Sequence, residues 1–312
     1  MVAVVLLALL TGCVVSRVPT AAQSMPQPAA PSPQDDWVRF LRTPGPLQHS
    51  AHTSATWAVP LKGLVDLTDP AAAGLRQGDV PIVLPVHVLT HSDGGTWLVD
   101  SGIDTDLAEG GHGGVRGLVR GFTGSIEPVA PLAEIVGERT VAGVLLTHSH
   151  LDHVLGLPDL ALDVPVVMGP GELDARAGQN MLLGRTMASI LGRRTAVRTL
   201  DLTDAAPLGP VPKAWDILGD GSLWALASPG HTPGSIAVLA RPTEGPVLFT
   251  GDTCHTVWGW EHGVAPGTYT ADAERNERSL QALKSLQQAI PELRVFVGHE
   301  LDGVGTGVDN MP

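Results

Sequence analysis

One short run restricts this chain more than any other feature. Residues Thr147 to His153 read Thr-His-Ser-His-Leu-Asp-His, so three imidazoles and one carboxylate fall within six positions. The run directly follows the apolar segment Val141 to Leu146, which is predicted to be a buried strand. Imidazole and carboxylate are ligands of Zn²⁺ and related first-row metals. Gathering such groups without a metal costs desolvation free energy. The run therefore predicts a metal site at a strand end.

The same arrangement, an apolar strand followed by polar residues, recurs along the chain. Asp100, His231, Asp252 and His299 all lie at such strand ends. Ends of buried strands are rigid, so ligands placed there converge with little further ordering. Strands are predicted over 81–90, 96–100, 141–146, 164–168, 196–202, 223–228, 235–240, 246–250 and 293–297, and helices over 131–137, 179–194 and 271–289.

Four separated motifs resemble the metallo-β-lactamase superfamily and occur in that family's order. They are the run 147–153, Ser-Pro-Gly-His-Thr-Pro-Gly at 228–234, Phe-Thr-Gly-Asp at 249–252, and Val-Gly-His at 297–299. The resemblance covers the chain from about Pro81 onward. It implies an α/β fold, the metallo-β-lactamase αββα sandwich of two mixed sheets flanked by helices, in a single domain over 37–312.

The resemblance also implies a dinuclear site, with two Zn²⁺ as the expected ions and other first-row metals as alternatives. A hydroxide shared by the two metals attacks a carbonyl in such sites, and Asp152 relays a proton to the leaving oxygen. Asp100 is expected to orient a ligand imidazole, the alternative being that it only caps its own turn. The implied ligands are His148, His150 and His231 for the first metal, Asp152, His153 and His299 for the second, and Asp252 as the bridge.

Within the superfamily the chain is most similar to the lactonase-like group, which includes the N-acyl-homoserine lactone lactonases. Its last helix and the ending Gly298-His299-Glu300 match that group. The lactonases carry a tyrosine three residues after the bridging aspartate, where this chain has His255. His255 is therefore expected to donate a hydrogen bond to the developing oxyanion. Trp258 and Trp260 either line an acyl pocket or pack the loop onto the core. A small-molecule ester or lactone is the expected substrate.

Several alternatives stay open at this point. A β-lactamase with this histidine run usually lacks the bridging aspartate, which Asp252 supplies here. A glyoxalase II-like thioesterase adds a basic helical substrate domain that these residues do not show. The net charge of −13 disfavours a nucleic-acid substrate, because binding a phosphate backbone requires lysine and arginine. A non-catalytic metal-binding lipoprotein is the remaining alternative.

The N-terminal residues resemble a bacterial lipoprotein signal. The apolar run Val2 to Leu10 is too short to span a bilayer, and it leads into Leu-Thr-Gly-Cys ending at Cys13. Residues 1–12 are expected to be a signal peptide, and 13–36 a lipidated Cys13 with a tether rich in proline, alanine and serine. The chain is then exported and anchored to a lipid bilayer through Cys13, on the periplasmic or cell-surface side. A buried first strand is the alternative.

Overall fold

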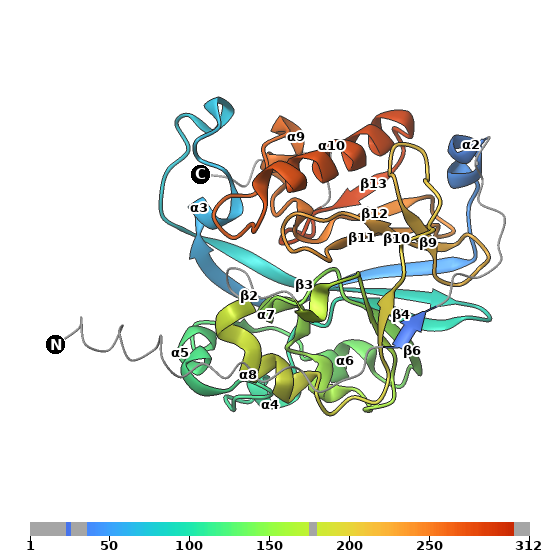
Figure 1. Ribbon diagram of the computed structural model, residues 1–312. Coiled ribbons are helices and arrows are strands. Elements are labelled where there is room, and N and C mark those ends of the chain that lie inside the picture. Colours follow the sequence, from blue (N-terminus) through green and yellow to red (C-terminus); the bar gives the residue numbers. More distant parts are fainter. Residues whose placement is uncertain (1–22, 26–35, 175–179, 303–312) are drawn as a thin grey trace.

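The structure is a computed structural model that describes residues 23–25, 36–174 and 180–302. Two β-sheets lie face to face, and helices cover both outer faces (Figure 1). The strands are β1 (Gln23–Met25), β2 (Leu47–Pro60), β3 (Asp79–His91), β4 (Gly95–Val99), β5 (Glu127–Pro128), β6 (Val141–Leu145), β7 (Val166–Met168), β8 (Val197–Leu200), β9 (Ala214–Asp216), β10 (Leu223–Ala227), β11 (Ile236–Ala240), β12 (Val247–Phe249) and β13 (Arg294–Phe296).

The helices are mostly short, and the longest of those described is α10 with 17 residues. The α-helices are α2 (Trp37–Arg42), α3 (Leu61–Leu64), α4 (Thr105–Ala108), α5 (Arg120–Thr123), α6 (Leu132–Val136), α7 (Leu151–Val154), α8 (Asn180–Ile190), α9 (Val257–His262) and α10 (Ala273–Ala289). Single 3₁₀ turns are η1 (Pro70–Ala72), η2 (Gly117–Val119), η3 (Leu157–Asp159), η4 (Glu172–Asp174) and η5 (Gly251–Thr253).

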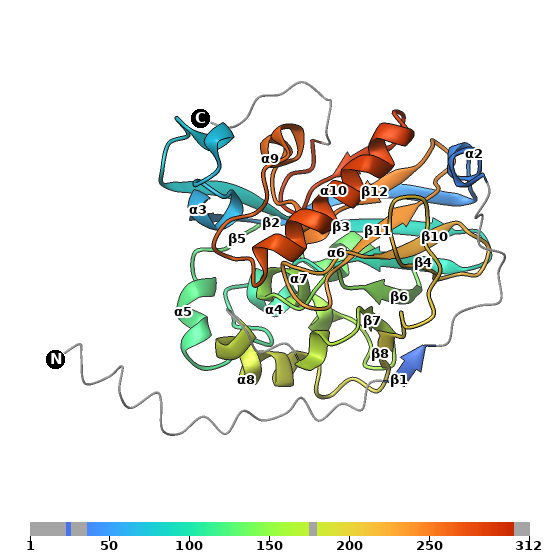
Figure 2. The same ribbon diagram turned by 45° about the horizontal axis from the view of Figure 1, so that its top comes forward.

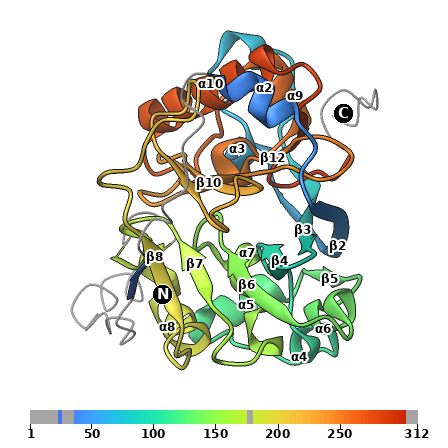
Figure 3. The same ribbon diagram turned by 90° about the vertical axis from the view of Figure 1, so that its right-hand side faces the viewer.

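Both sheets are mixed. The larger has the order β1-β8-β7-β6-β4-β3-β2-β5. Its β1–β8, β8–β7, β7–β6 and β6–β4 pairs are parallel, and its β4–β3, β3–β2 and β2–β5 pairs are antiparallel. The smaller has the order β13-β12-β11-β10-β9 and is antiparallel except for its β12–β13 pair. Figure 3 shows the layers from the side: α9 and α10, the smaller sheet, the larger sheet, and then a layer that includes α4, α6 and α8.

The layers form because successive apolar side chains along a strand point to opposite faces of its sheet. On β6, Val144 packs toward the helices while Leu145 packs between the sheets. On β11, Leu239 packs toward α10 while Val238 faces the other sheet. Side chains in a strand point alternately to opposite faces, so a strand that is apolar at every position is buried on both. Helix α10 crosses the outer face of the smaller sheet (Figure 2) and closes that core.

The structure confirms the predicted αββα arrangement and most predicted elements. The apolar stripe predicted on the last helix is buried, and it comprises Leu280, Leu283 and Leu286, with Ile290 just after the helix. The long strand β2 was not predicted, because its small polar residues give no clear alternation. The region after Asp252 contains helix α9, where only a loop was predicted.

Most of the predicted signal peptide and tether, Cys13 included, lies outside the described residues. Within the predicted tether, β1 pairs in parallel with β8 at the edge of the larger sheet. Helix α2 begins at Trp37. None of the helices in the described ranges combines the length and apolar composition that crossing a bilayer requires.

Candidate metal centre

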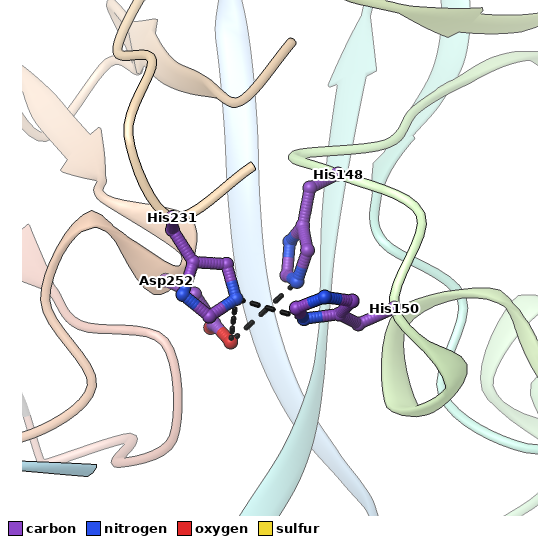
Figure 4. Close-up of side chains that lie close together, drawn as sticks. All are labelled: His148, His150, His231 and Asp252. Carbon is purple, nitrogen blue, oxygen red and sulfur yellow. Dashed lines mark hydrogen bonds and ion pairs between the residues drawn. The ribbon is translucent and has the colours of Figure 1, made fainter. Parts of the chain in front are cut away.

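The predicted ligands meet where strands of the two sheets end. The run 148–153 follows β6, whose end is level with that of its parallel neighbour β4. Asp252 and His299 follow the parallel pair β12 and β13, and His231 lies in the turn from β10 to β11. Figure 4 shows His148 and His150 pointing from one side toward His231 and Asp252 on the other. The centre is therefore built across the junction of the two sheets.

The donor atoms are spaced as ligands of shared metal ions. His231 Nε2 lies 2.8 Å from His150 Nδ1 and 3.3 Å from Asp252 Oδ2, which is itself 3.6 Å from His148 Nε2. Two ligands that bind one metal at about 2.1 Å lie roughly 3 to 3.5 Å apart. These four residues can surround one ion, as the sequence predicted for the first metal.

A second group forms beside the first. His299 Nε2 lies 3.5 Å from Asp152 Oδ2, and His153 Nε2 lies 3.8 Å from the same oxygen. Asp252 joins the two groups, because its Oδ1 is 3.4 Å from His153 Nε2 while its Oδ2 faces the first group. The structure thus brings all seven predicted ligands together, with Asp252 between the two sets.

Buried polar atoms without hydrogen-bond partners indicate whether a metal fits this cluster. His148 Nε2, His153 Nε2 and Asp252 Oδ1 are buried and have no hydrogen-bond partner in the described part of the chain. Burying polar atoms without partners costs free energy. Two imidazole lone pairs and a carboxylate oxygen directed into one space are the donors that Zn²⁺ uses. The residues present therefore fit a pair of metal ions.

The ring nitrogens that face away from this space are held by neighbours. His148 Nδ1 lies 3.2 Å from Thr147 Oγ1, and His231 Nδ1 lies 3.4 Å from Thr270 Oγ1. His299 Nδ1–H donates to the backbone carbonyl of Val83 at 3.0 Å. Such outer partners fix the tautomer and orientation of a metal-binding imidazole. The cluster is therefore arranged for metal ions before any are bound.

Asp100 supplies the outer partner of His153. Its Oδ2 lies 2.8 Å from His153 Nδ1, and its Oδ1 accepts from the backbone N–H of Thr147 at 2.8 Å. Asp100 contacts an imidazole as the sequence predicted, and its bond to Thr147 ties it to the turn after β6 rather than to its own turn. Its φ of 58° is the one positive value outside glycine in the described residues. Such strained backbone concentrates at functional sites.

The pKa values of the histidines in the cluster shift in opposite directions. Burial lowers the pKa of His148 and of His231 well below the usual value, which leaves both imidazoles neutral as metal ligands must be. Burial alone would also lower the pKa of His153, but the charges of Asp100, Asp252 and Asp152 raise it well above that value. Burial raises the pKa of Asp252, yet the surrounding imidazoles outweigh burial and hold the pKa well below its usual range.

Glu172, in η4, is a functional residue that the sequence analysis missed. Its Oε1 accepts from the N–H and the hydroxyl of Ser149, both at 2.8 Å. Its Oε2 accepts from the hydroxyl of Thr232 at 2.7 Å and from the N–H of Gly234 at 3.1 Å. One buried carboxylate therefore joins the two loops that carry His148, His150 and His231. The only available signal was an acidic residue just after a buried strand.

Asn276 on α10 joins the loop of His231 to the turn that carries Asp252. Its Oδ1 accepts from the N–H of His231 at 3.0 Å, and its Nδ2–H donates to the carbonyl of Thr253 at 3.0 Å. The residue is fully buried. A polar residue on the inner face of an amphipathic helix signals such a link.

His255 is buried within the cluster and is absent from the described lining of the adjacent cavity. Its Nδ1–H donates to the carbonyl of Leu64 at 3.0 Å, and its Nε2 lies 3.1 Å from Asp252 Oδ2. Both nitrogens face protein atoms, so the placement does not favour the oxyanion role that the sequence suggested. Trp260 packs in the core under α10 and Trp258 stacks on His262, so these tryptophans pack the loop and do not line the cavity.

A cavity of about 470 Å³ opens onto the metal centre. Its described lining contains no lysine or arginine, and the side away from the metal ligands is largely apolar. Burial raises the pKa of Tyr269 in this lining, and the charges of Asp152 and Asp79 raise it further. The lining residues are Trp57, Ala58, Val59, Pro60, Leu64, Ile82, Val119, Gly121, Ser125, His150, Leu151, Asp152, His231, Asp252, Tyr269 and His299.

Proteins of known function resemble this chain over most of its length. It is 28% identical over 239 residues to the N-acyl homoserine lactonase AttM of Azorhizobium caulinodans, covering 73% of this chain and 87% of that protein. It is 26% identical to the AttM of Rhizobium johnstonii, covering 72% and 86% of the two chains.

Solved structures share the fold. A quorum-quenching N-acyl homoserine lactone lactonase superposes with a TM-score of 0.62 at 15% identity, covering 83% of this chain and 95% of that one. An N-acyl homoserine lactone hydrolase with N-hexanoyl-L-homoserine at its catalytic metal centre gives 0.61 at 18% identity, with the same coverage. Residues 83–299 match the family model of the metallo-beta-lactamase superfamily. The chain therefore belongs to the metallo-β-lactamase superfamily.

Proposed function

We propose that this protein is a dinuclear metal-dependent hydrolase of neutral carboxylic esters, with lactones as the favoured class and Zn²⁺ as the metal. One observation carries the proposal: seven side chains of the types that bind metals converge at the end of an apolar cavity whose described lining has no lysine or arginine. The lactonases among the relatives support the choice of lactones.

Different residues of the chain would bind the metals and transfer the proton in such a reaction. His148, His150 and His231 would hold one ion, Asp152, His153 and His299 the other, with Asp252 between them. When bound, the two metals supply an activated water as nucleophile and polarise the substrate carbonyl. Asp252 is almost fully buried, whereas 15% of the Asp152 side chain is exposed. Asp152 also lines the cavity, so it is the carboxylate placed to pass a proton to the departing oxygen.

The cavity lining favours uncharged substrates over the alternatives. Glutathione thioesters and β-lactam antibiotics carry carboxylates, which proteins usually bind with arginine or lysine. Neither residue occurs in the described lining. Trp57 and Leu64 instead offer apolar surface for an acyl chain.

A hydrolysis screen of the full, metal-replete chain tests the proposal. The panel contains N-acyl homoserine lactones of increasing chain length, simple aryl esters, a glutathione thioester and a β-lactam. We expect hydrolysis of lactones and esters, with two metal ions per chain by elemental analysis. Hydrolysis confined to the thioester or the β-lactam would refute it, as would an active protein with one ion. Asp252→Asn is the matched control for contaminating activity.

We also propose that Cys13 carries lipid and anchors the enzyme to a membrane. The proposal rests on Leu-Thr-Gly-Cys after a short apolar run, and these residues lie outside the described part of the structure. Several acyl chains anchor a protein firmly, whereas one does so weakly. Cys13→Ser should move the protein from the membrane fraction to the soluble fraction. Unchanged membrane fractionation of this variant would contradict the anchor.

A further inference from the structure

The chain contains a single tyrosine, Tyr269, and it lines the cavity beside the metal ligands Asp152 and His231. It belongs to the segment between α9 and α10, outside the predicted motifs. Its hydroxyl has no hydrogen-bond partner among the described residues, although half-buried tyrosines commonly find one. A phenol O–H on a cavity wall without a protein partner is available to a bound molecule.

The backbone on both sides of Tyr269 is fixed. The N–H of Thr268 donates to the carbonyl of Lys62 at 2.9 Å, and the N–H of Ala271 donates to the carbonyl of His231 at 3.1 Å. The hydroxyl of Thr270 lies 3.4 Å from His231 Nδ1. Tyr269 is thus held one residue away from the outer partner of a metal ligand. The backbone at Tyr269 is therefore tied to the loop of His231.

The ring is seated on Gly63. A Cβ at Gly63 would overlap the Tyr269 ring, so only glycine allows this close approach. Other polar groups of the wall are already engaged, since Trp57 Nε1–H donates to Ser125 Oγ at 2.9 Å. His255, the donor suggested by sequence, directs both nitrogens at Leu64 and Asp252. Tyr269 is thus a neutral donor of the described lining whose hydroxyl has no partner among the described residues.

We propose that the Tyr269 phenol donates a hydrogen bond to the acyl oxygen of the substrate while the tetrahedral intermediate forms. Water adds to the carbonyl carbon, a C–O bond forms, and the electron pair of the C=O bond moves onto the oxygen that accepts from Tyr269. Asp152 accepts the proton that the adding water releases, and it passes this proton to the departing oxygen as the ester C–O bond breaks, giving acid and alcohol. Tyr269 keeps its own proton throughout. This inference rests on the proposed ester hydrolysis.

Tyr269→Phe removes the hydroxyl and keeps the ring, so it isolates the hydrogen bond. In the full, metal-replete chain we expect kcat/KM on the best ester to fall by about tenfold to a hundredfold, as for other oxyanion donors. Metal content should stay at the wild-type value. Trp57→Phe is the matched cavity-wall control, and its main effect should be on KM. Wild-type kcat/KM in Tyr269→Phe would overturn the proposal, and so would a loss that parallels loss of metal.

A binding measurement separates this inference from the proposed function. Hexylphosphonate carries charged oxygens that mimic the oxyanion, and calorimetry should show weaker binding to Tyr269→Phe than to the wild type. Equal binding would overturn the role of Tyr269. If the wild type hydrolyses no ester at all, the proposed function fails, and the phosphonate comparison still tests the donor. A loss of rate that grows with the pKa of the leaving alcohol would assign the phenol to the departing oxygen instead and also overturn the proposal.

Discussion

Two groups of histidines lie along the same pair of strands, β12 and β13. The first is the metal centre, whose Asp252 and His299 each follow one of these strands by three residues. The second is the pair His49 and His87, which packs between the sheets against the rings of Phe249 and Phe296. Within the second pair, His49 Nε2 lies 3.3 Å from His87 Nδ1.

The two groups differ in what surrounds them. The metal centre mixes imidazoles with carboxylates and leaves buried donor atoms unpartnered. The pair between the sheets has aromatic neighbours, and each histidine has the other as a partner. Burial lowers the pKa of His87 well below the usual value and that of His49 to about 4, so both are neutral packing groups. Burial alone therefore does not identify a metal site, whereas carboxylates with unpartnered imidazole nitrogens do.

Metal content and activity should differ most between the variants Asp252→Asn and His87→Phe. We expect Asp252→Asn to hold one metal or none per chain and to lose more than about a hundredfold in hydrolysis. Removing a metal ligand should reduce activity at least as much as removing an outer partner of a ligand. Removal of an outer partner typically lowers metal affinity or activity ten- to a hundredfold. His87→Phe should keep the wild-type metal content. Elemental analysis of both variants measures the metal content. Two ions per chain in both variants would contradict the predicted difference.

Glu172→Ala should have the next largest effect. It leaves buried donors of Ser149, Thr232 and Gly234 without an acceptor. The free energy of unfolding should fall by on the order of 3 kcal/mol, and metal affinity should fall with it because two ligand loops are released. Urea unfolding and metal titration measure both quantities. Glu134→Ala, at an exposed position, is the matched control. Unchanged metal affinity in Glu172→Ala would show that the loops are positioned without it.

Asp100→Asn should act on one side of the centre. An amide is a weaker acceptor for His153 than a carboxylate, so binding of the second metal should weaken by about tenfold to a hundredfold. The first metal, held by His148, His150 and His231, should stay bound. Stepwise titration with Zn²⁺ resolves the two affinities. Equal weakening of both sites would mean that Asp100 supports the whole turn rather than one imidazole.

The smallest effect concerns the pH dependence of stability at the pair between the sheets. The folded pKa of His49 and of His87 lies below the unfolded value of about 6.5. The unfolded chain therefore binds more protons as the pH falls from about 6.5 toward 4, and stability is lost over that window. His87→Phe should lose about 2 kcal/mol less than the wild type between pH 7 and pH 4.5. Urea unfolding at both pH values measures this difference, and His262→Phe, at an exposed position, should match the wild type.

The sequence predicted the seven side chains that the structure brings together, because each follows an apolar strand within a recognisable motif. It could not place Glu172 or Asn276, since their partners lie 23 and 45 residues away along the chain. It missed β2 because pairing with β3 stabilises that strand more than any local pattern does. It assigned the donor role to His255 by position in a motif, whereas the packing of the segment after α9 brings Tyr269 to the cavity.

The cavity wall and the metal ligands come from different segments. The wall is contributed mainly by the end of β2, by α3, by the region 119–125 and by Tyr269, while the ligands sit in turns after β6, β10, β12 and β13. Mutations in the wall can therefore accumulate without removing a ligand. A lineage built on this scaffold can change the molecules it accepts through a few wall substitutions at positions other than Tyr269, while all seven proposed ligands stay in place. The separation makes the fold a permissive starting point for divergence of substrate preference.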